Sequence, residues 1–259
     1  MGKHGQTAID YLELRVDADF FAYRICQANE ESLDWGDDIT TIYSNFRDVV
    51  KGFEREITNL RHRFDTDAVT LYFSDTKNFR KTVDPEYKGN RTKRKPVGYK
   101  RLLDWCEENY KVVRIKNVEA DDALGMDCHL NMLDKFVLIS PDKDMKQICC
   151  RHFNGEEEFE VTAEDADRMF WTQCLTGDAV DGYKGVPGIG AVKAAKILKK
   201  ATPETWWSIV VDTYEKAELT EEDALRNARC ARILRPGEYN HTINEPVLWT
   251  PSQSQPQPQ

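Results

Sequence analysis

Short apolar runs of strand length recur along this chain, and three of them end next to an aspartate. They are Tyr11–Asp17, Ala68–Phe73 just before Asp75, and Phe136–Ile139 just before Asp142. Residues between these runs have apolar side chains at helical spacing, and they predict helices over 39–63, 99–109 and 120–133. Strands that alternate with helices predict an α/β fold, in which a mostly parallel, twisted sheet is flanked by helices.

In a parallel sheet, ligands collect beyond the carboxyl ends of the strands. We therefore expect carboxylates that are distant in sequence to converge at one edge of the sheet. Such a group cannot stay ionised without cations, and its hard oxygen ligands suit two Mg²⁺ or Mn²⁺ ions. A site of this kind predicts metal-dependent phosphodiester hydrolysis. The candidate ligands are Asp17, Asp75, Glu119, Asp121, Asp122, Asp142, Asp144, Asp178 and Asp181.

Two of the acidic clusters also have a simpler interpretation. Glu119, Asp121 and Asp122 open a predicted helix, where acids commonly complement the helix dipole. The Asp-x-Asp of Asp142 and Asp144 would also suit an ordinary turn with a helix cap. Asp178 and Asp181 are spaced to share one side of a helical turn.

The net charge of −9 conceals a strongly basic segment over 77–101, which contains ten cations and two acids. Its local charge of +8 and its tyrosines favour contact with nucleic-acid phosphates over a merely solvated loop. The seven cysteines include no C-x-x-C pair and predict free thiols in a reducing compartment. No apolar run of membrane-spanning length and no secretory signal is apparent, so we expect a cytoplasmic protein that does not enter membranes.

A glycine-rich loop, Gly185–Gly190, precedes a predicted helix and resembles the helix-hairpin-helix hairpin that binds DNA. Glycines let backbone N–H groups approach a phosphate at a helix N-terminus. Cations cluster nearby at Lys184, Lys193 and Lys196. We predict a nuclease core over 1–160 with an arch at 77–101, a helical region over 161–249 with the hairpin module at 178–200, and a disordered tail over 250–259.

Taken in order, these motifs resemble the 5′-nuclease superfamily, which includes flap endonucleases and phage 5′→3′ exonucleases. The matching segments include Y-F-S-D at Asp75, E-Y-K-G-N-R over 86–91, V-E-A-D-D over 118–122, S-x-D-x-D over 140–144, and G-D-x-x-D before G-V-P-G-I-G. The C-terminal stretches L-T-E-E-D-A-L and A-R-I-L-R are similar to the exonuclease of short-tailed phages.

The resemblance implies a role for each matched position. Asp17, Asp75, Glu119, Asp121 and Asp122 would hold the first metal ion, and the other four acids the second. At the base of a helical arch, Lys88 and Arg91 would contact the scissile phosphate beside Asp17, Asp75 and Asp122. Gly188 and Gly190 would grip the duplex with a K⁺ ion. The residues implied to bind the DNA strands are Arg24, Arg80, Tyr87, Lys93, Arg94, Lys95, Lys184, Lys193 and Lys196.

The substrates implied are duplex DNA with a free 5′ end, 5′ flaps and RNA–DNA hybrids, in phage DNA replication or degradation of host DNA. Replication proteins are expected partners, and the host cytoplasm is the expected location. Two other functions stay open from the residues alone. A PIN-type ribonuclease would share the sheet and the acids but would not need Gly185–Gly190. A non-enzymatic DNA-binding module would not need nine acids.

Overall fold

The computed structural model describes residues 12–128, 135–199 and 201–251. A six-stranded sheet lies at its centre, in the order β5-β4-β1-β6-β7-β8. Five strands are parallel, and only β8 runs antiparallel to its neighbour β7. The predicted mostly parallel sheet is confirmed. Its strands are β1 (Glu13–Asp17), β4 (Val69–Tyr72), β5 (Lys111–Val113), β6 (Phe136–Ile139), β7 (Arg151–Phe153) and β8 (Glu158–Glu160).

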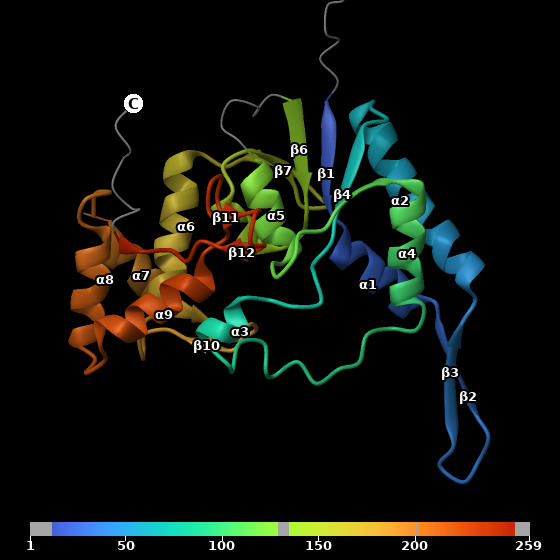
Figure 1. Ribbon diagram of the computed structural model, residues 1–259, viewed down its shortest axis with the longest axis horizontal. Helices are drawn as coiled ribbons and strands as arrows, with labels where there is room; N and C mark the ends of the chain where they lie inside the picture. The colour runs from blue at the N-terminus through green and yellow to red at the C-terminus, as the bar shows by residue number, and fades with distance from the viewer. Residues whose placement is uncertain (1–11, 129–134, 200, 252–259) are drawn as a thin grey trace, which may run out of the picture.

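Helices cover both faces of the sheet (Figure 1). Alternate residues of the central strands, such as Leu14, Leu71 and Val137, pack in one apolar cluster with one group of helices. The other face packs with α5 (Ala120–Asp127) through Tyr72 and Leu138. Because both faces are buried, β6 is apolar at every position, whereas β1 also contains Arg15, which pairs with Glu13. The first group of helices is α1 (Ala18–Ala28), α2 (Phe46–Phe64) and α4 (Tyr99–Asn109).

The C-terminal helices form a second apolar cluster, which also includes Tyr87. They are α6 (Ala163–Thr176), α7 (Ala191–Leu198), α8 (Trp206–Glu215) and α9 (Glu221–Ala231). The predicted domain boundaries stay predictions, and the predicted tail lies outside the described residues beyond Pro251. The smaller elements are α3 (Arg80–Val83), the 3₁₀ helix η2 (Lys143–Gln147), and the strand pairs β9 (Gly177–Asp178) with β10 (Tyr183–Lys184) and β11 (Tyr239–Asn240) with β12 (Glu245–Pro246).

Three predicted features differ from the structure. The helix expected over 39–63 begins only at Phe46, where the Asn45 side chain accepts a hydrogen bond from the Arg47 N–H. Residues before it form a hairpin of β2 (Glu30–Asp34) and β3 (Thr40–Ser44), because the run Thr-Thr-Ile-Tyr is β-branched and aromatic. The D-x-x-D pair is not helical either, since Asp178 lies in β9 and Asp181 in the following turn.

The predicted arch is not helical. Between α3 and α4, residues 84–98 form turns and extended chain, which run beyond the carboxyl ends of the strands (Figure 1). Proline and glycine at four positions of this stretch account for the absence of a continuous helix. They are Pro85, Gly89, Pro96 and Gly98. The basic segment therefore runs from the C-terminal helices to α4 without regular secondary structure.

Gly125 in α5 should be sensitive to substitution. A Cβ atom at this position would overlap the carbonyl oxygen of Leu234 and the side chain of Ile233. Gly125→Ala is therefore expected to lower the free energy of unfolding by about 1–3 kcal/mol, because the packed backbone must move apart. Urea unfolding measures this change. A free energy of unfolding that Gly125→Ala leaves unchanged would show that the backbone around Leu234 moves apart without cost.

Candidate active site

Asp17 ends β1 at the edge of the sheet where the predicted site should lie. Its side chain is buried and accepts a hydrogen bond of 2.8 Å from the Ser140 hydroxyl, which follows β6. Burial raises the pKa of Asp17 to about 7, and repulsion from Asp19 and Asp142 adds to this. The neighbouring strands β1 and β6 therefore bring Asp17 and Asp142, which follows β6, within electrostatic range of each other.

Glu119 and Asp181 share the cationic side chain of Lys88. The Lys88 ammonium lies 2.5 Å from a Glu119 oxygen and 3.5 Å from an Asp181 oxygen. Arg91 pairs with the other Asp181 oxygen at 2.7 Å. Burial alone would raise the pKa of Glu119, but Lys88 and Arg80 lower it to about 2. The basic turn over 86–91 thus joins an acid of α5 to an acid that follows α6.

Tyr87 is buried, and its hydroxyl contacts the same two acids, Glu119 and Asp181. Its ring is 2% exposed and stacks on Tyr183, with ring centroids 6.2 Å apart. Its hydroxyl lies 2.9 Å from both Glu119 and Asp181. The expectation that Tyr87 contacts DNA is therefore wrong in this structure, because the apolar core of the C-terminal helices takes up the ring.

Arg80 and Asp122 form a buried ion pair. The guanidinium, 1% exposed, donates to both Asp122 oxygens at 2.7 Å, and Asp122 is fully buried. Asp122 also accepts from the N–H groups of Glu119 and Leu234. These contacts correct two expectations. Arg80 was expected to bind DNA but is buried, and Asp122 was expected to bind a metal ion but its oxygens accept hydrogen bonds from protein donors. Asp122 positions the start of α5, where it completes the capping box with Glu119.

A second acidic cluster surrounds Lys143. Its ammonium lies 3.2 Å from Asp178 and 4.0 Å from Asp144. Burial raises the pKa of Asp144 to about 7, and Asp142, Asp178 and Asp181 add repulsion. One oxygen of Asp178 also accepts the N–H groups of Val180 and Asp181, which fixes the turn after β9. The four acids predicted for a second metal ion therefore do lie within electrostatic range.

Asp75 is oriented differently from the other acids. Its carboxylate accepts the Asn117 N–H at 2.9 Å and lies 3.6 Å from Arg114. Burial opposes these contacts, but backbone donors and Arg114 keep the pKa of Asp75 below its ordinary value. Asp121, at the start of α5, has its pKa raised well above the ordinary range by burial and by Asp122 and Glu119.

Three residues of the site were not predicted from the sequence. Asp19 accepts hydrogen bonds from the Ser74 N–H and the Tyr99 hydroxyl, and it lies beside Asp17. Lys143 and Arg114 pair with predicted acids. Lys143 stands inside the Asp-Lys-Asp motif, so its position between two candidate ligands could have indicated it.

The donor set fits hard divalent cations. It consists of carboxylate oxygens, and mutual repulsion and burial raise the pKa of Asp17, Asp121 and Asp144. Within 12–128, 135–199 and 201–251, however, no three carboxylate, imidazole or thiol groups are close enough together to coordinate one ion. Lys88 and Lys143 instead bridge the acids, so these lysines would have to shift as a cation enters.

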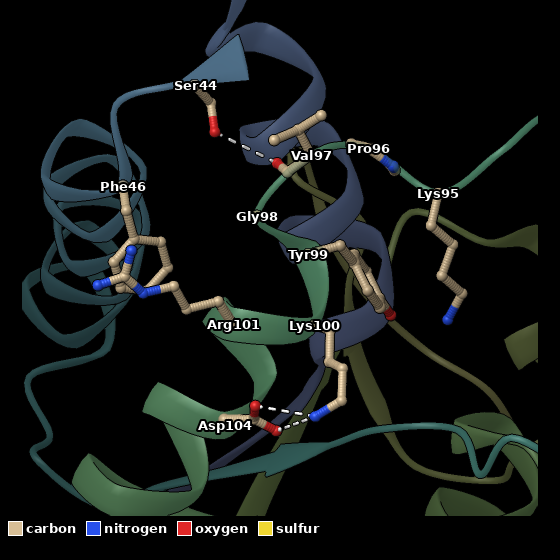
Figure 2. A pocket seen from close by; sticks show the side chains of 10 residues that line it. All are labelled: Ser44, Phe46, Lys95, Pro96, Val97, Gly98, Tyr99, Lys100, Arg101 and Asp104. Carbon is tan, nitrogen blue, oxygen red and sulfur yellow. Dashed lines mark hydrogen bonds and ion pairs between the residues drawn. The ribbon is translucent and has the colours of Figure 1, made fainter. Parts of the chain in front are cut away.

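The other predicted DNA-binding residues lie in two places. Lys93, Arg94 and Lys95 are exposed on the extended segment, and Arg94 pairs with Glu30 at 2.6 Å. Arg24 on α1 pairs instead with Glu56 of α2 at 3.1 Å. A hollow of about 520 Å³ lies at the start of α4 and is lined by Lys95, Lys100 and Arg101 together with Ser44, Phe46 and Tyr99, whose side chains are drawn in Figure 2.

The glycine-rich loop leads directly into α7. Gly188 has a φ of +74°, which a residue with a Cβ rarely adopts, and its carbonyl accepts from the Lys193 ammonium at 2.8 Å. Gly190 is the N-cap, and no side chain caps this helix. Lys184, Lys193 and Lys196 are exposed around it. The first turn of α7 can therefore offer N–H groups and cations to a phosphate.

The metal-free protein should lose stability as the pH rises from about 4 to about 7. Asp17 and Asp144 have pKa values near 7 in the folded protein, against 3.8 ordinarily. Between these values the unfolded chain has released protons that the folded protein keeps, so rising pH favours unfolding. Urea unfolding at several pH values measures this. Asp17→Asn should reduce the slope, and Asp104→Asn at an exposed position of α4 is the matched control.

The chain matches the family of 5′-3′ exonucleases with an N-terminal resolvase-like domain over residues 14–169. The exodeoxyribonuclease of Enterobacteria phage T3 is 29% identical, with 92% of each chain covered. The exonuclease of Escherichia phage T7 is also 29% identical, over 92% of this chain and 93% of that protein.

A structure of T5 5′-exonuclease with bound divalent metal ions (zinc) has the same fold, with a TM-score of 0.63. It is 19% identical and covers 85% of this chain and 88% of its own. Within the described residues, no helix is long and apolar enough to cross a membrane. Since the matched family region takes up more than half of the sequence, this chain belongs to the 5′-3′ exonuclease family.

Proposed function

We propose that this chain is a Mg²⁺- or Mn²⁺-dependent 5′→3′ exonuclease that hydrolyses phosphodiesters near free 5′ ends of duplex DNA. The contact of Lys88 with both Glu119 and Asp181 carries this proposal. It places two cations of one turn, Lys88 and Arg91, among acids from both halves of the chain. Cations beside clustered carboxylates are the groups that phosphodiester hydrolysis needs.

Two divalent ions would be held by the acids around Asp17 and Glu119 and by those around Asp144 and Asp178. When bound, they would supply Lewis acidity and neutralise the charge of the scissile phosphate. Freed from their carboxylate partners, Lys88 and Arg91 would then donate hydrogen bonds to the phosphate oxygens as negative charge develops. The Asp122–Arg80 pair would keep Glu119 and Asp121 in place at the start of α5.

The rest of the molecule would hold the two parts of the substrate. The exposed cations Lys93, Arg94 and Lys95 would attract the 5′ strand along the open segment. Gly188 and Gly190 would present backbone N–H groups to a duplex phosphate, with K⁺ as the expected monovalent ion. These contacts read the backbone and not the sequence, so 5′ flaps and RNA–DNA hybrids are proposed as further substrates. Phage replication proteins stay predicted partners.

A 5′-end-labelled linear duplex, a labelled 5′-flap duplex, an RNA–DNA hybrid and a closed circular duplex test this proposal with Mg²⁺ present. We expect short labelled products from the linear and flapped DNA, no cutting of the circle, and no release with EDTA. DNA binding without any release would favour a non-enzymatic module. Cutting of single-stranded RNA alone would favour a PIN-type ribonuclease.

A further inference from the structure

The hairpin of β2 and β3 stands apart from the rest of the molecule (Figure 1). Residues 31–43 are all exposed, and no other strand of the described chain pairs with β2 or β3. The hairpin is nevertheless ordered by its own contacts. The Trp35 indole donates to Thr41 at 3.0 Å, and the Tyr43 hydroxyl donates to Glu31 at 2.7 Å. Two-stranded hairpins are marginal in water, so a further contact would stabilise this one.

One face of the hairpin is apolar. Glu31 lies opposite Tyr43, and Leu33 lies opposite Thr41, so odd-numbered residues of both strands share a face. That face carries four large exposed side chains, and the most exposed, Trp35, is 66% accessible. A contiguous apolar face in solvent commonly marks an interaction surface. The four side chains are Leu33, Trp35, Ile39 and Tyr43.

The outer edge of β3 is unprotected against pairing. Its sequence, Thr-Thr-Ile-Tyr-Ser, has no charge and no proline, which are the features that usually block edge pairing. The Trp35 N–H donates to the Ile39 carbonyl at 2.9 Å. By the alternation of an antiparallel ladder, the N–H groups of Thr40 and Ile42 then point to the free edge. The edge of β2, in contrast, bears Glu30, Glu31 and Asp34.

Charge along the hairpin is distributed so that its two ends are complementary. The tip contains Asp34, Asp37 and Asp38 and no cation. At the base, Ser44 lines the hollow that also holds Lys95, Lys100 and Arg101 (Figure 2). Two hairpins lying antiparallel would therefore bring the acidic tip of each next to the basic base of the other. Phosphate backbones would instead be repelled by the tip.

We propose that a second copy of this chain occupies the free edge of β3, forming a two-fold symmetric, four-stranded antiparallel sheet centred on Thr41. Thr40 would exchange backbone hydrogen bonds with the partner's Ile42. Ile39 would lie across from the partner's Tyr43, a favourable cross-strand pair. Asp38 would lie beside the partner's Ser44, close to the three cations of the hollow that Ser44 lines. The pairing is isologous, so it closes as a dimer.

Sedimentation velocity of the full chain without DNA, over rising protein concentration, tests this proposal. We expect a concentration-dependent dimer. Ile42→Pro should raise the dimer dissociation constant about 100-fold. Proline lacks the N–H that position 42 would donate in each copy, so two backbone hydrogen bonds are lost, each contributing about tenfold. Ile42→Val keeps both bonds and should leave the dimer intact. Thermal unfolding by circular dichroism checks that each variant is folded. We expect both variants to fold like the parent protein, because the hairpin is exposed.

Charge reversal tests the antiparallel arrangement separately. Asp38→Lys and Lys100→Glu should each weaken the dimer, and the double variant should restore it. A protein that stays monomeric at every concentration would overturn the proposal, as would a dimer that Ile42→Pro leaves unchanged. Failure of the double variant to restore association would overturn the antiparallel arrangement. None of these readouts depends on nuclease activity.

Discussion

Replacing Lys88 by methionine is expected to lower kcat on a 5′-labelled duplex by about 10²–10³-fold. Methionine is an unbranched side chain of similar length, but it removes the ammonium that lies between Glu119 and Asp181 and 5.1 Å from the centroid of the Tyr87 ring. The lost donor would act only as negative charge develops on the phosphate, so the Kd for duplex DNA should change little. Single-turnover cleavage and fluorescence anisotropy separate the two quantities.

Lys51→Met is the matched control, because Lys51 is exposed on α2 and pairs with the nearby Asp48. It should cleave and bind like the parent protein. An unchanged kcat for Lys88→Met would show that the turn over 86–91 does not take part in the reaction. A large loss of binding at unchanged kcat would assign Lys88 to substrate capture.

Replacing Arg80 by methionine is expected to lower the free energy of unfolding by about 3–5 kcal/mol, since Asp122 would be left as an uncompensated buried charge. The guanidinium also donates to the carbonyl oxygens of Cys230 and Arg232, so it ties α3 to the chain after α9. Urea unfolding monitored by circular dichroism measures the loss. Binding of DNA by the folded fraction should persist, because Arg80 is buried.

The double variant Arg80→Met/Asp122→Asn separates charge from packing. It removes both charges, so it should recover part of the stability that Arg80→Met loses. Asp122→Asn alone tests the role that the family resemblance implied. If this variant unfolds like the parent protein but no longer cleaves DNA, Asp122 acts as a metal ligand, and its assignment as the structural partner of Arg80 is wrong.

The central sheet was predictable because its strands are short runs that are either apolar throughout, as in Phe136–Ile139, or alternate apolar and polar residues, as in Glu13–Asp17, with helical patterns between them. Asp17 and Asp142 lie near each other because Asp17 ends β1, Asp142 follows β6, and these two parallel strands are neighbours. The helix expected over 39–63 shows the limit of this reasoning. Ile42 satisfies helical spacing as well as Phe46 does, and only the Asn45 cap and the β-branched run before it separate the two elements.

Burial of charged and aromatic side chains was not predictable. In sequence, Arg80 and Tyr87 belong to a basic segment and look like the exposed Lys93 and Lys95. In the structure, Arg80 meets Asp122, 42 positions away, and Tyr87 enters the core of the C-terminal helices. Such partners are chosen by how separate elements pack, and no local pattern records that choice.

The sequence by itself determined the alternation of strands and helices, the family, and the set of acids from which a metal site could be built. Local patterns suffice for these, because periodicity and chain direction fix which residues reach the edge of a parallel sheet. Only the tertiary structure decided which cation faces which acid: Lys88 joins Glu119 to Asp181, Lys143 joins Asp144 to Asp178, and Arg80 is committed to Asp122. Ion pairs depend on distances between distant segments, and these distances exist only after the chain has packed.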